Sequence, residues 1–208
     1  DLAEATLREA KTRFPANTAL LFELGNVLAA QRNYEAAIAE YQEGLAADPA
    51  DPRLLKAQSL AHYRLGAFDA AADLARTLAE REDAGSGDHA WLASVEEARG
   101  NADAARAAYE TAIAADGRNW LAMNNLSALL AETDPARAVT LAEQAVTLAP
   151  DVAAVKDTLG WALFQAGRLD EAEATLRPLT EAANAAPTTV YRLGRVLLAR
   201  DRVDEGRS

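Results

Sequence analysis

Small residues recur along the chain at a nearly constant spacing, within stretches whose apolar residues follow the period of an amphipathic helix. One series consists of Gly25, Ser59, Ala93, Ser127, Gly160 and Gly194. Its successive members lie 34, 34, 34, 33 and 34 residues apart. Self-similarity at a fixed period of about 20–50 residues is typical of stacked repeats, so this spacing predicts a repeat architecture.

Two further series share that period and its single shorter step. The second series consists of Ala3, Ala37, Ala71, Ala105, Ala138, Ala172 and Gly206. The third marks the ends of units with Pro15, Pro49 and Pro150, and Asp83 and Gly117 fill the intermediate places. Together they predict helix pairs repeated along the chain. Runs of alternating β-branched residues are absent, so no sheet is expected.

The turn inside each unit can also be recognised. The residues that end the first helix are Arg32 with Asn33, Gly66, Gly100 and Gly167. A carboxylate then meets the positive end of the second helix, at Glu35, Asp69, Asp103 and Asp170. In the fourth unit, which contains the one-residue deletion, Asp134 and Pro135 act as cap and first-turn proline.

These motifs resemble the tetratricopeptide repeat. The best matching unit has Leu24-Gly25 in its first helix, Ala37 and Tyr41 in its second, and Pro49 at its close. The stretch DTLGWALFQAGRLDEA, residues 157–172, is a second good match. The resemblance implies an all-α fold, a right-handed α-α superhelix (TPR solenoid) of antiparallel helix pairs.

The period predicts one repeat array over residues 1–208. Residues 1–17 form the second helix of a preceding repeat, full repeats follow at 18–51, 52–85, 86–119, 120–152 and 153–186, and residues 187–208 form a partial repeat. The chain begins inside an expected helix and both ends divide a repeat. We therefore expect a fragment or processed product whose exposed repeat ends favour self-association.

The second repeat is the least regular. Gln58, Ser59 and His62 stand where Leu, Gly and a large apolar residue are usual, and the connection at residues 80–88 is the longest. A softer joint is therefore expected between the second and third repeats. Glu96 occupies a position expected to be between helices, which leaves the register of the third repeat open, and Pro178 should bend a second helix.

The composition of the chain disfavours some classes of binding partner. The net charge is -11, which disfavours a phosphate backbone or an anionic membrane surface. No apolar run approaches the roughly 20 residues of a membrane span. The chain has no cysteine, which excludes disulfides and thiolate sites but leaves the compartment open.

No catalytic constellation is found, so neither an enzyme nor a cofactor or metal site is expected. His62 lies on a packing face, and His89 has no second histidine or cysteine at ligand spacing. The glycines at residues 85–87 lack the strand and the Gly-Lys-Ser/Thr ending of a phosphate loop.

The resemblance implies that ligands lie on the concave face lined by the first helix of each pair. Helical spacing places the following candidates there: Phe22, Asn26, Arg53, Lys56, Tyr63, Arg64, Trp91, Asn124, Asn125, Asp157, Trp161, Tyr191, Arg192 and Arg195. The tryptophans are either binding anchors or core side chains. The basic positions are either sites for the carboxylates of an extended peptide or a solvated mixed-charge face.

One family specificity can be tested by residue. Chaperone-adaptor members bind a terminal carboxylate through Lys and Asn at fixed places on successive first helices. Asn26 fits one place, but Phe22 stands where the first lysine belongs and Ala57 where the next asparagine belongs. That specificity is therefore not expected.

The favoured function is a non-enzymatic scaffold that binds a protein segment in the concave groove. Residues 134–172 also resemble bacterial envelope repeat proteins associated with exopolysaccharide export and protein sorting, which would place the chain in the periplasm or at the outer membrane rather than in the cytoplasm. A third hypothesis is the recognition arm of a larger enzyme such as a glycosyltransferase.

Overall fold

A computed structural model describes residues 2–200, and in this range the chain forms twelve α-helices and no strand. The helices are α1 (Leu2–Arg13), α2 (Thr18–Ala30), α3 (Tyr34–Ala47), α4 (Pro52–Arg64), α5 (Phe68–Ala79), α6 (Ser86–Ala98), α7 (Ala102–Ala115), α8 (Trp120–Leu130), α9 (Pro135–Leu148), α10 (Ala153–Gln165), α11 (Leu169–Thr180) and α12 (Pro187–Ala199). The predicted all-α superhelical repeat fold is confirmed. The expected start of a second helix at residues 203–208 lies outside the described residues.

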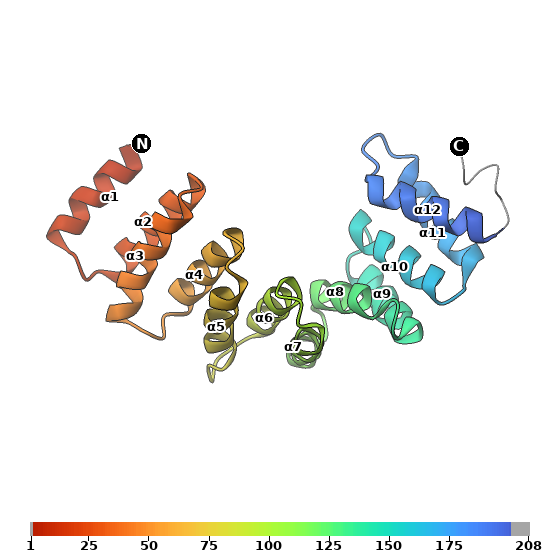
Figure 1. Cartoon of the computed structure of the whole chain (residues 1–208), viewed down its shortest axis with the longest axis horizontal. Helices are drawn as coiled ribbons and strands as arrows, with labels where there is room; N and C mark the ends of the chain where they lie inside the picture. Colours follow the sequence, from red (N-terminus) through yellow and green to blue (C-terminus); the bar gives the residue numbers. More distant parts are fainter. Residues whose placement is uncertain (1, 201–208) are drawn as a thin grey trace. The chain divides into compact units, whose positions relative to one another are not determined.

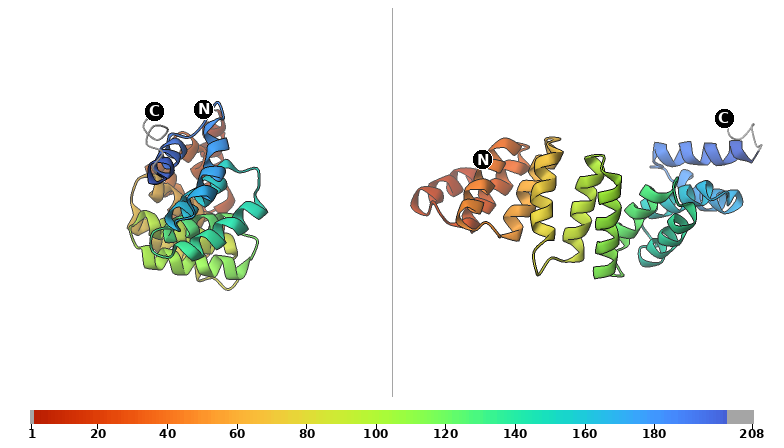
Figure 2. Two further views of the ribbon diagram at one scale, coloured as in Figure 1. Left: turned by 90° about the vertical axis from the view of Figure 1, so that its right-hand side faces the viewer. Right: turned by 60° about the horizontal axis from the view of Figure 1, so that its bottom comes forward.

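The chain divides into two compact units, residues 1–108 and 109–208, with the boundary inside α7. In the first unit each helix from α1 to α6 packs on the next. In the second unit the same succession runs from α8 to α12, and α10 also contacts α8 and α12 (Figures 1 and 2). Helices that follow one another in the sequence therefore bury each other's apolar faces, as expected for stacked repeats.

The turns inside the pairs lie at the residues that the sequence predicts. Gly66, Gly100 and Gly167 have φ angles of 75°, 86° and 74°, in the left-handed region that glycine adopts without steric cost. Arg32 takes the same conformation with φ 62°, and among the described residues it is the only one other than glycine with a positive φ. In the fourth pair the Asp134 side chain accepts a hydrogen bond from the backbone N–H of Arg137, as predicted for a cap.

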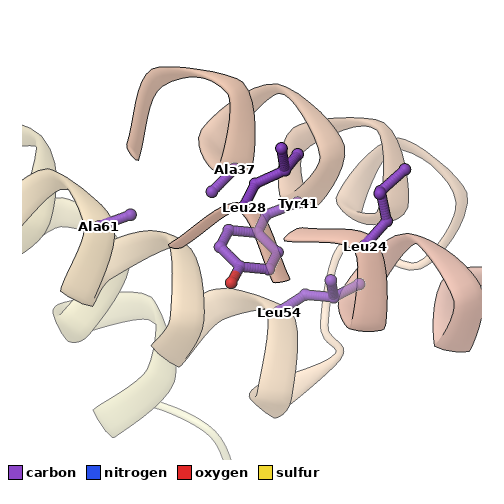
Figure 3. Close-up of a cluster of buried hydrophobic side chains, with 6 residues drawn as sticks. All are labelled: Leu24, Leu28, Ala37, Tyr41, Leu54 and Ala61. Atoms are coloured by element: carbon purple, nitrogen blue, oxygen red, sulfur yellow. The ribbon is translucent and has the colours of Figure 1, made fainter. Parts of the chain in front are cut away.

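The first series of small residues makes room for side chains of the second helix. A Cβ at Gly25 would lie 2.2 Å from Cε1 of Tyr41, whose ring packs among Leu24, Leu28 and Leu54 (Figure 3). A Cβ at Gly160 would lie 2.4 Å from Cγ of Leu176. Gly25 thus makes room for an aromatic ring of the second helix.

Two serines of the same series form hydrogen bonds to the second helix instead of making room for one of its side chains. The hydroxyl of Ser59 donates a hydrogen bond to the carbonyl oxygen of Ala71 at 2.8 Å, and Ser127 does the same to Ala138 at 2.8 Å. Both serines are fully buried. Because Ala71 and Ala138 belong to the second series, these bonds tie the two helices of a pair together.

Glu96 is buried, with 3% of its surface exposed, so the register places it between helices as the sequence pattern indicated. Its Oε1 accepts a hydrogen bond from Arg76 at 3.0 Å, and its Oε2 accepts from Arg99 at 3.4 Å and from Asn101 at 3.3 Å. Arg99 also pairs with Asp69 at 2.6 Å. This charged cluster connects α5 to α6.

Candidate binding site

A hollow of about 530 Å³ opens in the first unit between α2, α3 and α4. It is lined by Asn26, Ala29, Arg32, Tyr34, Tyr41, Ala57, Leu60, Ala61 and Arg64. The wall formed by α4 is mostly apolar, because Ala57, Leu60 and Ala61 lie there. Arg32 and Arg64 are exposed and contribute two positive charges, and none of the lining residues is acidic.

Asn26 lines the hollow, and a hydrogen bond from Tyr41 sets the orientation of its side-chain amide. The hydroxyl of Tyr41 donates a hydrogen bond to Oδ1 of Asn26 at 2.9 Å. Burial, together with the nearby charge of Glu23, raises the pKa of Tyr41 to about 12, so this hydroxyl stays protonated at neutral pH. Because Oδ1 accepts from Tyr41, the amide NH2 group (Nδ2) is the part of the Asn26 side chain that can donate to a ligand.

Arg53, another predicted site residue, already has a carboxylate partner. It donates to both oxygens of Asp51, at 3.2 Å to Oδ1 and 2.7 Å to Oδ2, and this hydrogen bonding lowers the pKa of Asp51. Its guanidinium lies 5.5 Å from the centre of the Phe22 ring. Phe22 is half-buried against the core, so Arg53 links the start of α4 to α2 and its charge is paired with Asp51.

Lys56, Tyr63 and Trp91 lie farther along the first unit. Lys56 is 3.6 Å from Asp88. The rings of Tyr63 and Trp91 lie 5.5 Å apart, and Nε1 of Trp91 donates to the Ser59 hydroxyl at 2.9 Å. Tyr63 and Trp91 are half-buried against the core between the second and third pairs, so they are packing residues at least in part.

In the second unit the predicted residues form an aromatic surface on α10 and α12. Trp161 stacks on Phe164 with ring centres 5.1 Å apart. The guanidinium of Arg192 lies 5.3 Å from the Trp161 ring and forms an ion pair with Asp157. Arg192 and Asp157 therefore neutralise each other, and their ion pair links α12 to α10.

Arg195 and Tyr191 extend this surface. Arg195 donates to the Tyr191 hydroxyl at 2.9 Å and lies 5.7 Å from the Phe164 ring. Tyr191 is 60% exposed, which leaves its ring open to solvent. The remaining candidates, Asn124 and Asn125, pair with each other at 3.1 Å, and Asn125 donates to the Tyr109 hydroxyl at 3.3 Å.

Sequence comparison with protein families agrees with this architecture. Tetratricopeptide repeat models match residues 1–52, 22–89 and 92–153, and another tetratricopeptide repeat model matches residues 129–188. These matches cover most of the chain. The chain belongs to the tetratricopeptide-repeat family. Repeats of this family form protein-interaction scaffolds, a typically non-enzymatic role. No curated protein matches the sequence.

Solved tetratricopeptide-repeat structures have the same fold. A repeat protein from Parabacteroides merdae superimposes with a TM-score of 0.76 at 16% identity, covering 98% of this chain and 81% of that one. The protein YrrB, described as having an unusual peptide-binding site, gives 0.69 at 13% identity, covering 95% and 98%. PilF of Pseudomonas aeruginosa gives 0.75 at 14% identity, covering 95% and 90%. At these identities the similarity shows the fold.

Several residues that line the hollow between α2, α3 and α4 were not predicted from the sequence. Helical spacing selected Asn26 and Arg64, but Arg32, Tyr34 and Leu60 were not selected. Arg32 and Tyr34 lie at the turn and at the start of the second helix, away from the face considered. One signal in the sequence was available, since Arg32 stands at the helix end where Gly66, Gly100 and Gly167 stand in other repeats.

The described residues show little that resembles other kinds of site. They contain no group of three or more His, Asp or Glu residues placed to hold a metal ion. None of the helices described is long and apolar enough to cross a membrane. Burial lowers the pKa of His62, which is the effect expected of a histidine in a packing position.

Proposed function

We propose that this tetratricopeptide-repeat chain binds an extended segment of a partner protein along the first helices of its pairs, with the hollow between α2 and α4 as an anchoring point. The single observation that supports this is the composition of the hollow. It combines an apolar wall with the Asn26 amide and two guanidinium groups, in about 530 Å³. A concave site that mixes apolar surface with a few convergent polar groups is the usual form of a binding site.

The second unit provides a surface of the same character. The Tyr191 ring is exposed, and Arg195 lies over Phe164 with no carboxylate partner among the described residues. Rigid aromatic side chains beside an arginine are typical of residues that dominate binding energy. YrrB has the same fold and is described as binding peptide, which agrees with the proposal.

The proposal can be tested with peptides selected from a random displayed library on the immobilised wild-type chain. The affinity of the selected peptides is then measured for wild type, Arg64→Glu and Arg106→Glu. Arg64 lines the hollow, whereas Arg106 is exposed on α7 and does not line it. We expect Arg64→Glu to weaken binding about tenfold or more, which corresponds to about 1.4 kcal/mol.

Arg106→Glu is the matched control, because it changes the net charge by the same amount. It should leave the affinity nearly unchanged, since a single distant exposed charge is largely screened at physiological salt. A library that yields no binder, or binders that both variants hold equally well, would remove the hollow as the anchoring point.

The resemblance to envelope proteins associated with exopolysaccharide export, and the role as recognition arm of a larger enzyme, stay predictions.

A further inference from the structure

Arg32 occupies a backbone conformation that costs free energy for an arginine. Its φ is 62°, while the equivalent turns use Gly66, Gly100 and Gly167. A side chain with a Cβ in the left-handed region costs about 1–2 kcal/mol relative to the ordinary conformation. Glycine at this position would be easier to accommodate, so the Arg32 side chain should provide something that glycine cannot.

The Arg32 side chain lines the hollow together with Arg64, which comes from the last turn of the next first helix. Neither guanidinium has a carboxylate partner among the described residues. Asn26 adds a side-chain amide NH2 group, whose orientation is set by the Tyr41 hydroxyl. The hollow thus presents donors, and its ligand must supply acceptors.

We infer that the hollow binds side-chain carboxylates of an acidic segment of the partner, and that Arg32 is a binding residue held in the left-handed turn for this purpose. This inference rests on the proposed function and specifies its ligand. Guanidinium and carboxylate groups form paired, charge-assisted hydrogen bonds, which are the strong ones among protein hydrogen bonds.

The charge of the residues around the hollow favours an acidic ligand, although the net charge of the whole chain is -11. Charges farther away than about 8–10 Å are screened at physiological salt. The two arginines of the hollow outweigh the nearby carboxylate of Glu23, whose charge acts on Tyr41. Two other arginines of the candidate surface are neutralised within the chain, because Arg53 pairs with Asp51 and Arg192 with Asp157. The hollow keeps its positive charge.

Side-chain carboxylates fit better than a chain terminus. The two guanidiniums belong to successive helix pairs, one at the turn after α2 and one at the end of α4. Each guanidinium can take one carboxylate in a bidentate pair, so the hollow suits two acidic groups. A chain terminus supplies only one.

The test uses a fluorescein-labelled peptide with alternating Glu and Leu residues and an amidated C-terminus, and its Gln-for-Glu counterpart. Fluorescence anisotropy gives Kd, and thermal unfolding gives Tm. Wild type should bind the Glu peptide at least about tenfold more tightly than the Gln peptide. Arg32→Gly should weaken binding of the Glu peptide about tenfold and raise Tm by about 2–4 °C, because it removes the backbone strain.

Two variants serve as controls. Gly167→Arg places an arginine at the equivalent turn of the second unit, where a Cβ would meet no atom within 4 Å. It should lower Tm because of the left-handed φ and leave the affinity unchanged. Arg64→Gln should weaken binding of the Glu peptide about tenfold without the rise in Tm.

Each contrary result has a distinct meaning. A rise in Tm for Arg32→Gly with unchanged Kd would overturn the inference, because Arg32 would then be a tolerated turn residue only. Binding of the same Glu peptide with a free C-terminal carboxylate, but not of its amidated form, would also overturn it. Equal binding of the Glu and Gln peptides, lost in Arg64→Gln, would overturn the acidic ligand while the proposed function survives.

Discussion

The absent side chain of Gly25 is what allows the Tyr41 ring to lie between α2 and α4. A Cβ there would be 2.2 Å, 2.6 Å and 2.8 Å from three ring atoms. We expect Gly25→Ala to lower the free energy of unfolding by about 1–3 kcal/mol, since the ring must shift in a packed core. Urea unfolding followed by circular dichroism measures this.

The control for Gly25→Ala is Gly117→Ala. A Cβ at Gly117 would have no atom within 4 Å, and its φ is not in the left-handed region. The change in unfolding free energy should stay within about 0.5 kcal/mol. A loss as large as that of Gly25→Ala would mean that clash with the ring is not the cause.

Ser59 and Ser127 form a natural comparison. Both donate to a carbonyl oxygen at 2.8 Å, but Ser59 also accepts a hydrogen bond from Nε1 of Trp91. Ser127→Ala removes one buried hydrogen bond to a carbonyl that lies within α9, which costs about 0.5–1.5 kcal/mol. Ser59→Ala also removes the acceptor of an indole N–H, so it should cost more. Equal losses in chemical denaturation would contradict a structural role for the Trp91 bond.

His62 should make stability depend on pH. Burial lowers the pKa of His62 in the folded state below its ordinary value of about 6.5. As pH falls below that value, the unfolded chain binds a proton that the folded chain does not, so the free energy of unfolding decreases. His62→Gln should therefore show a smaller loss of stability between about pH 7 and pH 5. Identical pH profiles for the two proteins would argue against a lowered pKa for the half-buried imidazole of His62.

At the scale of helices, the connection between α5 and α6 is the expected weak point. Four charged groups bridge it: Asp69 and Arg76 from α5, and Glu96 and Arg99 from the next pair. Three of the four are partly or largely exposed, so salt should weaken their attraction. An apolar contact would not weaken in this way.

We expect amide hydrogen exchange in residues 80–88 to be faster than in the fifth pair, α10 and α11. The connection itself, residues 80–85, offers few hydrogen bonds within the backbone to protect its amides, and residues 86–88 form the first turn of α6. Adding salt should raise exchange at the ends of α5 and α6 more than in α10. Slower exchange at residues 80–88 than in the fifth pair would show that this joint is not soft.

The sequence predicted the helices well because their signals are local. Small residues at a fixed period, left-handed glycines such as Gly66 and a cap such as Asp134 act within one turn or one pair. The hollow was only half predicted, because Arg32 and Tyr34 lie at a turn, outside the helical face considered. The partner of Arg192 is Asp157, 35 residues away. Such pairing depends on the rotamers of long side chains, which periodicity does not encode.

At the scale of the whole chain, the division into residues 1–108 and 109–208 suggests where a destabilised repeat should loosen the structure. Gly160→Ala would place a Cβ 2.4 Å from Leu176, inside the second unit. Because each repeat is stabilised by its neighbours, exchange should rise in α9 to α12 and stay unchanged in α2 to α4. Mass spectrometry of exchanged peptides measures this. A uniform rise would indicate one cooperative unit.

The matched volumes inside the helix pairs limit how this protein can be rebuilt. A glycine faces a large side chain in two pairs, at Gly25 with Tyr41 and at Gly160 with Leu176. Ser59 belongs to a pair whose second helix has Ala75 where Tyr41 stands in the first. Grafting the second helix of one pair onto the first helix of another would therefore create a collision or an empty space. Designers who shorten, lengthen or shuffle this array should exchange complete hairpins, cut at the unit ends near Pro15, Pro49, Asp83, Gly117 and Pro150, rather than single helices.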